Sequence, residues 1–182
     1  KGIMQLTLHA PMADDRLLEI ASGTRCNIVP NLATAMLAGD WREAAADAFD
    51  VDDEDCQLET ELVDGNTRLA VTGASCPEKG KNAAKMLIAV LNKLGIGGAP
   101  IALLDEAAGE GSEGANLGIA GSDAVSGKLT INLGLLSAKE GKLNVTFDCR
   151  FPVFFNDRTI SETVAKRLAP AGFVLEPTHA SQ

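Results

Sequence analysis

The side chains that could perform acid–base or metal chemistry are few in this sequence. Its only two histidines, His9 and His179, lie at opposite ends of 182 residues. A catalytic zinc site takes three His, Asp, Glu or Cys ligands that lie close together, and neither histidine has a second candidate ligand at a usable spacing. We therefore expect no metal site within this chain and no complete catalytic centre that depends on one.

The cysteines offer a different chemistry, because a thiolate can act as a nucleophile. None of the four belongs to a C-x-x-C pair, and we interpret most of them as reduced, buried thiols. A nucleophilic cysteine needs a base beside it, and the sequence leaves open whether a histidine lies near Cys76 or Cys149 in the fold. A cysteine hydrolase therefore stays as an alternative. The four residues are Cys26, Cys56, Cys76 and Cys149.

Two polar segments imitate ligand-binding motifs without matching them. The acidic run at 50–55 lacks the central glycine and the final glutamate of an EF-hand loop. The Gly-Glu-Gly-Ser stretch at 109–112 has neither the G-x-G-x-x-G nor the G-x-x-x-x-G-K-[ST] arrangement of phosphate loops. We expect a solvated turn at the first segment and no nucleotide site at the second.

The composition is that of a folded domain with an acidic surface. The formal net charge is −9 at pH 7, whereas proteins that bind nucleic acids concentrate Lys and Arg on one face. No apolar run approaches the roughly 18 residues that cross a bilayer, and no signal-peptide pattern is present. We expect a cytoplasmic protein with no nucleic-acid or membrane partner.

Hydrophobic periodicity predicts a mixture of strands and helices. Because the strands do not alternate regularly with helices, we predict an α+β fold in which an antiparallel sheet, or sheets, carries helices on one face. The segment at 95–127 is rich in glycine, serine and acids, and is predicted to be an irregular insertion with one short helix. Strands are predicted at 4–8, 17–21, 33–37, 57–63, 68–72, 129–135, 143–147 and 174–175, and helices at 41–49, 83–94 and 159–168.

Turn and cap residues set several of these boundaries. The sequence Asp-Gly-Asn at 64–66 and the glycine that ends 139–141 predict two hairpin turns. Asp40, three residues before Glu43, is the predicted N-cap of the first helix. The spacing of Thr159 and the glutamate three residues later predicts a capping box for the last helix.

Two further polar residues have suggestive contexts, Asn27 after a turn and Arg150 near the end of a strand. An arginine can bind a carboxylate through two parallel hydrogen bonds, and an asparagine amide can donate to an oxyanion. Spacing alone favours a structural turn for Asn27 and a surface ion pair for Arg150. On these grounds a structural role and a ligand-binding role both stay open for each residue.

Five segments match motifs of one enzyme family in order and spacing, and together they cover nearly the whole chain. Residues 22–31 (SGTRCNIVPN) resemble a G-G-x-x-x-N-x-V-P-D stretch, and residues 77–84 (PEKGKNAA) resemble a P-E-x-G-x-N-A helix start. Further matches are Leu-Gly-Ile at 117–119 with a following aspartate, GKLTINLG at 127–134, and DCRFP at 148–152, which is similar to a D-x-R-x-P strand. These motifs resemble the PepV-like dipeptidases, which belong with carnosinase, aminoacylase and succinyl-diaminopimelate desuccinylase.

The resemblance implies that the chain is a lid without its catalytic machinery. In that family the lid is inserted into a separate catalytic domain that holds two zinc ions, and the family's H-x-D strand and Glu-Glu pair have no counterparts here. The lid would span 1–182, with two lobes at about 1–95 and 96–182. The parent would hydrolyse dipeptides or related N-acyl amino acids, and its catalytic domain would be the partner of this chain, which alone would carry no cofactor.

By motif position the resemblance also gives roles to Asn27 and Arg150. Asn27 resembles the lid asparagine that reaches the substrate, and Arg150 resembles the arginine that clamps its C-terminal carboxylate. One departure concerns 73–77, where the family usually has a longer A-H-[AG]-S segment whose histidine stabilises the oxyanion. This chain has Gly-Ala-Ser-Cys-Pro there. A trimmed loop, a segment missing from this sequence, or an inactive variant would each give that pattern.

A second hypothesis comes from the class of binding modules. A stand-alone α+β domain could form dimers through an exposed sheet edge or through the helix at 83–94. A tight dimer in size-exclusion chromatography would favour this hypothesis. A monomer with closely spaced termini would favour an excised lid.

Overall fold

The computed structural model describes residues 1–73, 81–109 and 111–177. The strands are β1 (Gly2–Pro11), β2 (Leu17–Ser22), β3 (Leu32–Leu37), β4 (Gln57–Val63), β5 (Asn66–Thr72), β6 (Ser122–Asp123), β7 (Gly127–Lys128), β8 (Thr130–Lys139), β9 (Lys142–Phe151) and β10 (Val174–Leu175). The α-helices are α1 (Arg42–Ala48), α2 (Ala83–Lys93), α3 (Gly98–Ala108) and α4 (Asp157–Leu168), and short 3-10 helices are η1 (Ala115–Leu117) and η2 (Ala169–Ala171).

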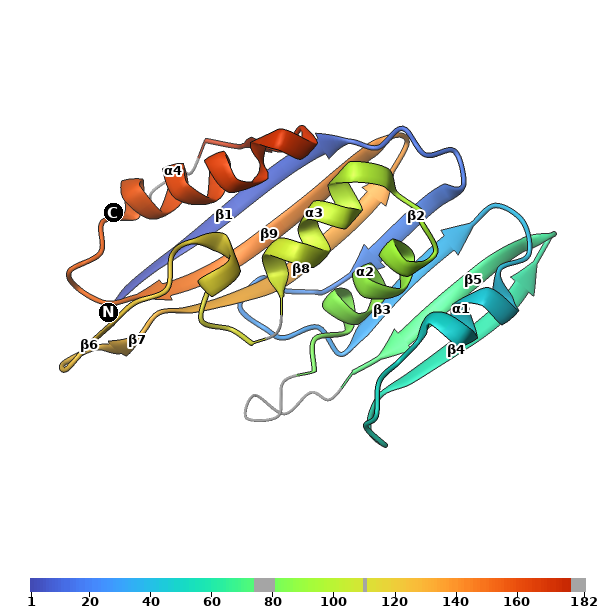
Figure 1. The fold of residues 1–182 in the computed structure, drawn as a ribbon, viewed down its shortest axis with the longest axis horizontal. Helices are drawn as coiled ribbons and strands as arrows, with labels where there is room; N and C mark the ends of the chain where they lie inside the picture. The colour runs from blue at the N-terminus through green and yellow to red at the C-terminus, as the bar shows by residue number, and fades with distance from the viewer. Residues whose placement is uncertain (74–80, 110, 178–182) are drawn as a thin grey trace.

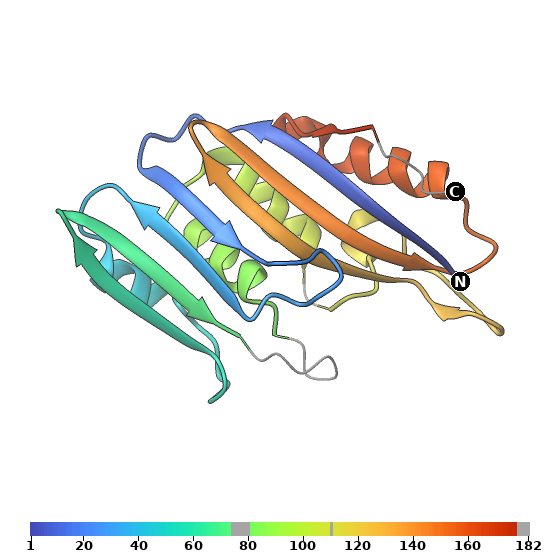
Figure 2. The same ribbon diagram turned by 180° about the vertical axis from the view of Figure 1, so that it is seen from behind.

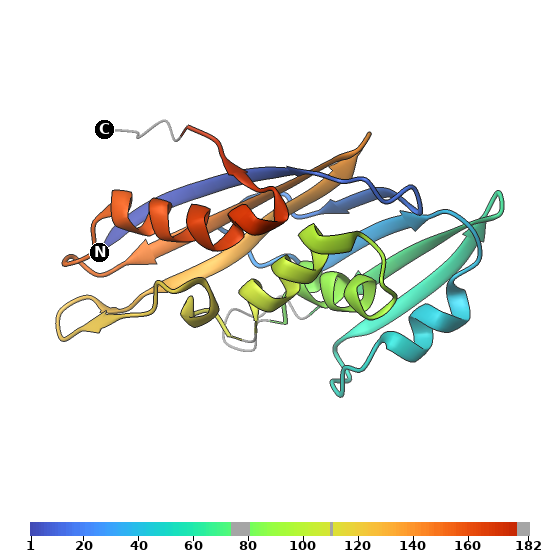
Figure 3. The ribbon, with the colours of Figure 1, turned by 45° about the horizontal axis from the view of Figure 1, so that its top comes forward.

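The main sheet is antiparallel and has the strand order β10-β1-β9-β8-β2-β3-β5-β4. The helices gather on one face of it (Figure 1), and the opposite face is uncovered when the molecule is seen from behind (Figure 2). In Figure 3 the red helix α4 runs beside the blue strand β1. The predicted α+β class, an antiparallel sheet with helices on one face, is confirmed.

The sheet consists of two halves that meet where β2 pairs with β8. That pairing covers four residue pairs, whereas β1 and β9 pair over ten. One half holds β10, β1, β9 and β8, so the first strand of the chain lies among strands from its second part. The division into two lobes at residue 95 stays a prediction, and a division that followed the sheet would put residues 2–11 with the later strands.

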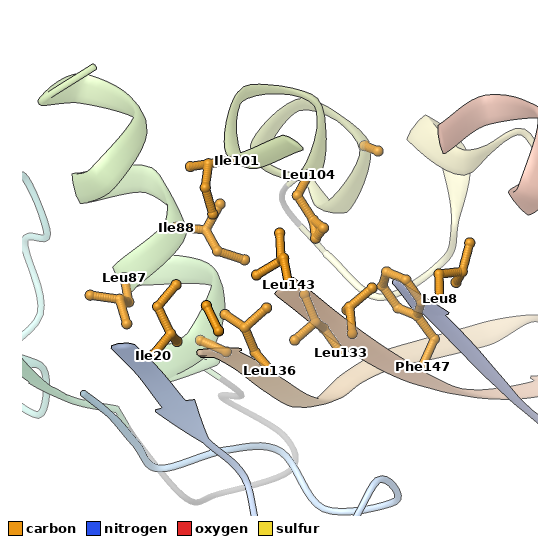
Figure 4. Packing of buried hydrophobic residues seen from close by; sticks show 14 of the residues in the cluster. Leu8, Ile20, Leu87, Ile88, Ile101, Leu104, Leu133, Leu136, Leu143 and Phe147 are labelled. Atoms are coloured by element: carbon orange, nitrogen blue, oxygen red, sulfur yellow. The ribbon is translucent and has the colours of Figure 1, made fainter. Parts of the chain in front are cut away.

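The hydrophobic core lies between the sheet and the helices. Alternate residues of β1 and β9 face the helices, which is the period of a strand with one buried side. Figure 4 shows side chains of α2 and α3 facing those of β8 and β9. Burying each large apolar side chain contributes about 1.5–3 kcal/mol. The fully buried members labelled there include Leu87, Ile88, Ile101, Leu104, Leu133 and Leu143.

The segment at 95–127 contains the one helix that the sequence predicts, but it is more regular than the expected irregular insertion. It contains the 11-residue helix α3, which packs against α2, followed by η1 and the small β6–β7 hairpin. Glycines and a proline concealed the length of this helix. Gly97 precedes it with a φ of 94°, and Pro100 lies in its first turn, where the missing N–H breaks no helical hydrogen bond.

Two helix starts also differ from the predicted caps. Helix α1 begins one residue later than predicted, so Trp41 is its N-cap, and the Asp40 carboxylate binds Arg42 through the guanidinium at 2.9 and 3.0 Å and through the backbone N–H at 3.2 Å. Helix α4 is capped by Asn156, whose Oδ1 accepts the Arg158 N–H at 2.8 Å. Thr159 therefore lies inside the helix, and the predicted capping box is wrong.

Both predicted hairpins are confirmed. Asp64 and Gly65 connect β4 to β5 with φ values of 51° and 80°, and Glu140 and Gly141 connect β8 to β9 with 53° and 77°. Two successive residues with positive φ form the turn whose twist matches that of the flanking strands. These turns fix the register of the two longest hairpins.

Asp14 joins the β1–β2 connection to the turn between α2 and α3. Its carboxylate accepts from Arg16 Nη2 at 2.7 Å and from the Gly97 N–H at 2.9 Å, and Arg16 also donates to the Gly95 carbonyl at 2.8 Å. The side-chain hydrogen bond from Arg16 holds the pKa of Asp14 well below its usual range. Burial opposes this shift, and the hydrogen bond from the Gly97 N–H adds to it.

We expect Asp14→Asn to lower the free energy of unfolding at pH 7 and to make it change less as the pH is lowered. Since the pKa of the folded carboxyl is depressed, its stabilisation is full above the unfolded value of about 3.9 and is lost as the pH falls below it. Urea titrations at pH 7 and pH 3 measure this, with Asp15→Asn as the exposed neighbouring control. The prediction is contradicted if Asp14→Asn differs from the wild type in the free energy of unfolding by the same amount at both pH values.

Candidate functional site

The segment between β2 and β3, residues 23–31, carries Asn27 and lies against β8 with backbone contact. An added Cβ on Gly134 would be 2.0 Å from the Cys26 carbonyl oxygen, and one on Gly23 would be 1.9 Å from the Gly134 carbonyl oxygen. Gly134 lies at the irregularity of β8 between Leu133 and Leu135. Only glycine permits so close an approach of two backbones.

Asn132 of β8 holds this segment on both sides of Asn27. Its Nδ2 donates to the carbonyl oxygens of Cys26 and Ile28, each at 3.0 Å. Its Oδ1 accepts from Nδ2 of Asn82 at 3.4 Å, and Asn82 is the N-cap of α2. The exposed side chain of Asn27 therefore projects from a backbone that is fixed to the sheet.

Arg150 lies near the end of β9 with about half of its side chain exposed. Its Nε is 3.6 Å from Oδ2 of Asp148, a buried carboxylate two residues earlier on the same face of the strand. Asp148 in turn is the cross-strand partner of Asn132. Within the described ranges, the structure gives the terminal guanidinium nitrogens of Arg150 no hydrogen-bond partner.

Asn27 and Arg150 line the same cleft, although they lie far apart in the sequence. The cleft has a volume of about 1320 Å³. A shallower hollow of about 620 Å³ lies over α1, but it contains neither predicted residue, so we place the candidate site in the larger cleft. Polar residues of its lining include Asn27, Asp52, Lys81, Asn82, Lys85, Asp105, Asn132, Asp148 and Arg150.

The two lysines of the cleft are already engaged. Lys85 Nζ donates to the carbonyl oxygens of Gly111 at 2.7 Å and Ala108 at 3.3 Å, at the end of α3, and burial lowers its pKa. Lys81 forms an ion pair with Asp53 at 3.6 Å. Arg150 is also paired, at 3.6 Å from Asp148, but through Nε, so its two terminal nitrogens can still bind a carboxylate as a pair of donors.

The described residues on either side of 74–80 lie beside the Asn27 segment. The Gly73 N–H donates to the Asn31 carbonyl and the Ala83 N–H donates to the Pro30 carbonyl, both at 2.9 Å. The histidine that the family has and this sequence lacks would lie in the segment 73–77. All of these residues except Gly73 lie outside the described part of the chain.

Cys149 does not suit the cysteine-hydrolase alternative. It is fully buried on the helix-covered side of β9, and burial, followed by the charge of Asp148, raises the pKa of its thiol to about 12. Its neighbour on β1 is Met4, five residues from His9, whose Nδ1 lies 3.3 Å from Glu176. The other candidates of that hypothesis, Cys76 and His179, lie outside the described residues.

We expect iodoacetamide at pH 7.5 to leave Cys149 unmodified in the folded protein, because a buried thiol with a raised pKa supplies almost no thiolate. The partly exposed Cys26 provides an internal control and should react under the same conditions. Mass spectrometry of peptides from native and denatured samples measures both residues. Modification of native Cys149 at the rate of Cys26 contradicts the prediction.

Residues 1–73, 81–109 and 111–177 contain no group of three or more His, Cys, Asp or Glu side chains that could hold a metal ion. These residues therefore do not fit a zinc ion, and we derive no chemical step through one. No helix within the same ranges has the length and apolar character needed to cross a membrane.

Three residues of the site were not singled out from the sequence. Asn82 has a local signal, since an asparagine directly before an apolar helix is a preferred N-cap. Asn132 and Asp148 lie in the motif stretches at 127–134 and 148–152, but an Asn and an Asp on strands have no local signal of a role until their neighbours are known. Their roles depend on contacts between distant parts of the chain.

The sequence is similar to part of a longer bacterial protein. It is 29% identical over 180 residues to the protein named "Putative dipeptidase YtjP" of Bacillus subtilis (strain 168), covering 90% of this chain and 39% of that protein. A solved structure, aminoacylhistidine dipeptidase from Vibrio alginolyticus, is 14% identical and covers 96% of this chain and 43% of its own, with a TM-score of 0.39, too low to support an argument. No family model matches the chain. The chain thus spans about two fifths of the relatives it matches.

Proposed function

We propose that this chain is the lid domain of a dipeptidase, which closes over a dipeptide or N-acyl amino acid held by a separate catalytic domain. The observation that carries the proposal is the joint position of Asn27 and Arg150 on one cleft. Their motif positions resemble those of the substrate-contacting lid residues of PepV-like dipeptidases. The sequence similarity to part of a longer dipeptidase supports a parent with a further domain.

Arg150 is proposed to bind the C-terminal carboxylate of the substrate. A guanidinium can donate two parallel hydrogen bonds to a carboxylate, and such charge-assisted bonds are stronger than neutral ones. The ion pair with Asp148 is made through Nε, so the two terminal nitrogens can serve the substrate. Asp148 is buried in the same cleft, and its charge favours a position of the guanidinium there.

Asn27 is proposed to donate its side-chain amide to the carbonyl oxygen of the scissile bond. Negative charge grows on that oxygen as the bond is attacked, and a donor that is already in place stabilises it. The exposed side chain and the anchored backbone of Asn27 are suited to this role.

The remaining chemistry belongs to the proposed catalytic domain. Two zinc ions bound there would supply the hydrolytic activity, while this chain orients the substrate and excludes water by closing. A cytoplasmic location of the parent is part of the same proposal.

The test is to purify the full-length product of the encoding gene and residues 1–182 alone, and to assay both against a panel of dipeptides. We expect hydrolysis by the full-length protein that is lost on treatment with a chelator and restored by zinc, and neither hydrolysis nor bound zinc for the isolated chain. Hydrolysis by the isolated chain with stoichiometric metal would overturn the proposal.

The alternative of a stand-alone dimerisation module is less well supported. Helix α2 packs against β3, β5 and β8 and contacts both α1 and α3, so its apolar residues are covered within the chain. The outer edge of β4 is the surface through which such a module could add a strand. A concentration-dependent dimer of residues 1–182 in size-exclusion chromatography would favour it.

A further inference from the structure

A pair of side-chain amides connects the Asn27 segment, the sheet and the start of α2. Asn82 Nδ2 donates to the Leu133 carbonyl at 2.8 Å and to Oδ1 of Asn132 at 3.4 Å. Asn82 Oδ1 accepts from the N–H groups of Ala84 and Lys85 at 3.0 and 3.3 Å. Asn132 completes the network through its two bonds to the Asn27 segment.

The chemistry of the partners fixes the orientation of both amides. Backbone carbonyl oxygens only accept hydrogen bonds, so the NH₂ group of Asn132 must face Cys26 and Ile28. Its oxygen then faces Asn82, which must present its own NH₂ group. All four N–H donors of the two side chains are used, and a polar network that is fully satisfied makes its surroundings rigid.

We infer that Asn132 is a positioning residue for the substrate site. Loops are ordinarily more mobile than the strands that they connect, but the backbone on each side of Asn27 is bound to one side chain from a paired strand. The cross-strand partner of Asn132 is Asp148, which contacts Arg150. The β8–β9 pair therefore sets the position of Asn27 relative to Arg150.

This inference rests on the proposed function where it assigns a substrate contact to Asn27, whereas the positioning itself can be measured without substrate. Hydrogen exchange of the full-length protein, followed by mass spectrometry of a peptide covering 23–31, reports the mobility of the segment. We expect Asn132→Ala to accelerate exchange there about tenfold, because two hydrogen bonds to the segment are lost. The matched control Asn144→Ala, on β9 outside the cleft, should leave it unchanged.

Unchanged exchange at 23–31 in Asn132→Ala overturns the inference, and so does an equal acceleration across the whole protein. Should that variant fail to fold, Asn132→Ser takes its place, because its polar side chain is too short to reach both carbonyls. Unchanged exchange at 23–31, or equal acceleration across the whole protein, would overturn the inference there too.

A kinetic double-mutant cycle separates positioning from general destabilisation. We expect Asn132→Ala to lower kcat/KM for a dipeptide about tenfold in the wild-type background and less than about twofold in an Asn27→Ala background, since it acts through Asn27. Equal losses in both backgrounds overturn the inference. If Asn27→Ala itself has no effect on kcat/KM, the proposed function fails at that residue, while the exchange experiment still decides whether Asn132 positions the segment.

Discussion

Replacing Arg150 with alanine in the full-length protein should raise KM for dipeptides about a hundredfold with a much smaller change in kcat. A hydrogen bond to a charged group contributes about 1.5–3 kcal/mol, and the proposed contact is made equally to the substrate and to the transition state. Steady-state kinetics with a free dipeptide measures both constants. Arg150→Lys should recover part of the loss, because it restores the charge without the paired donors.

Two controls make the Arg150 prediction specific. Arg68→Ala removes an arginine of β5 that lies outside the cleft, and it should leave both constants unchanged. A dipeptide whose C-terminus is amidated should be a poor substrate of the wild type and should be equally poor for Arg150→Ala. A further loss with the amidated substrate contradicts a carboxylate contact.

Gly134→Ala should produce the other large effect, a loss of at least about 2 kcal/mol in the free energy of unfolding and of about a hundredfold in kcat/KM. The new Cβ would lie 2.0 Å from the Cys26 carbonyl oxygen and 2.4 Å from its carbonyl carbon, so one backbone must move. The residue that follows Cys26 is Asn27, and a misplacement of about 1 Å at a reacting group can cost a hundredfold in rate.

The matched variant for Gly134 is Gly121→Ala, which also meets neighbours at short distance. There the nearest atoms, at 2.5 and 2.7 Å, belong to the ring of Phe155, a side chain that can move. We expect a smaller loss of stability and no change in kcat/KM. Urea titration and steady-state kinetics compare the two variants, and a Gly134→Ala protein as stable and active as Gly121→Ala contradicts the prediction.

The elements that sequence patterns predicted well are those whose signals are local. The hairpin at 64–66 depends on residues that accept positive φ, and the helix at 83–94 on apolar residues that repeat along one face. The extent of helix α3 was underestimated, as one short helix in an irregular segment, because its start contains Gly97, Gly98 and Pro100, which locally favour a loop. The helix is stabilised by the face that it buries against α2, and a tertiary contact of this kind gives no local signal in the sequence.

The candidate site was predictable only in part for the same physical reason. Asn27 and Arg150 were found through their motif context, and the structure brings both to one cleft. The hairpin of β8 and β9 was predicted, but the strand order that puts β8 beside β2 and β9 beside β1 could not be derived from periodicity, since it depends on how distant strands pair. The contacts of Asn132 with the segment that follows β2 depend on that order.

The most direct measurement is a crystal structure of the full-length protein with a non-hydrolysable dipeptide analogue bound. We expect the carboxylate of the analogue within about 3 Å of the Arg150 guanidinium nitrogens, and the side-chain amide of Asn27 at similar distance from the oxygen that replaces the scissile carbonyl. An analogue bound in the closed enzyme without contact to either residue would contradict the assignment of this chain as the lid of a dipeptidase.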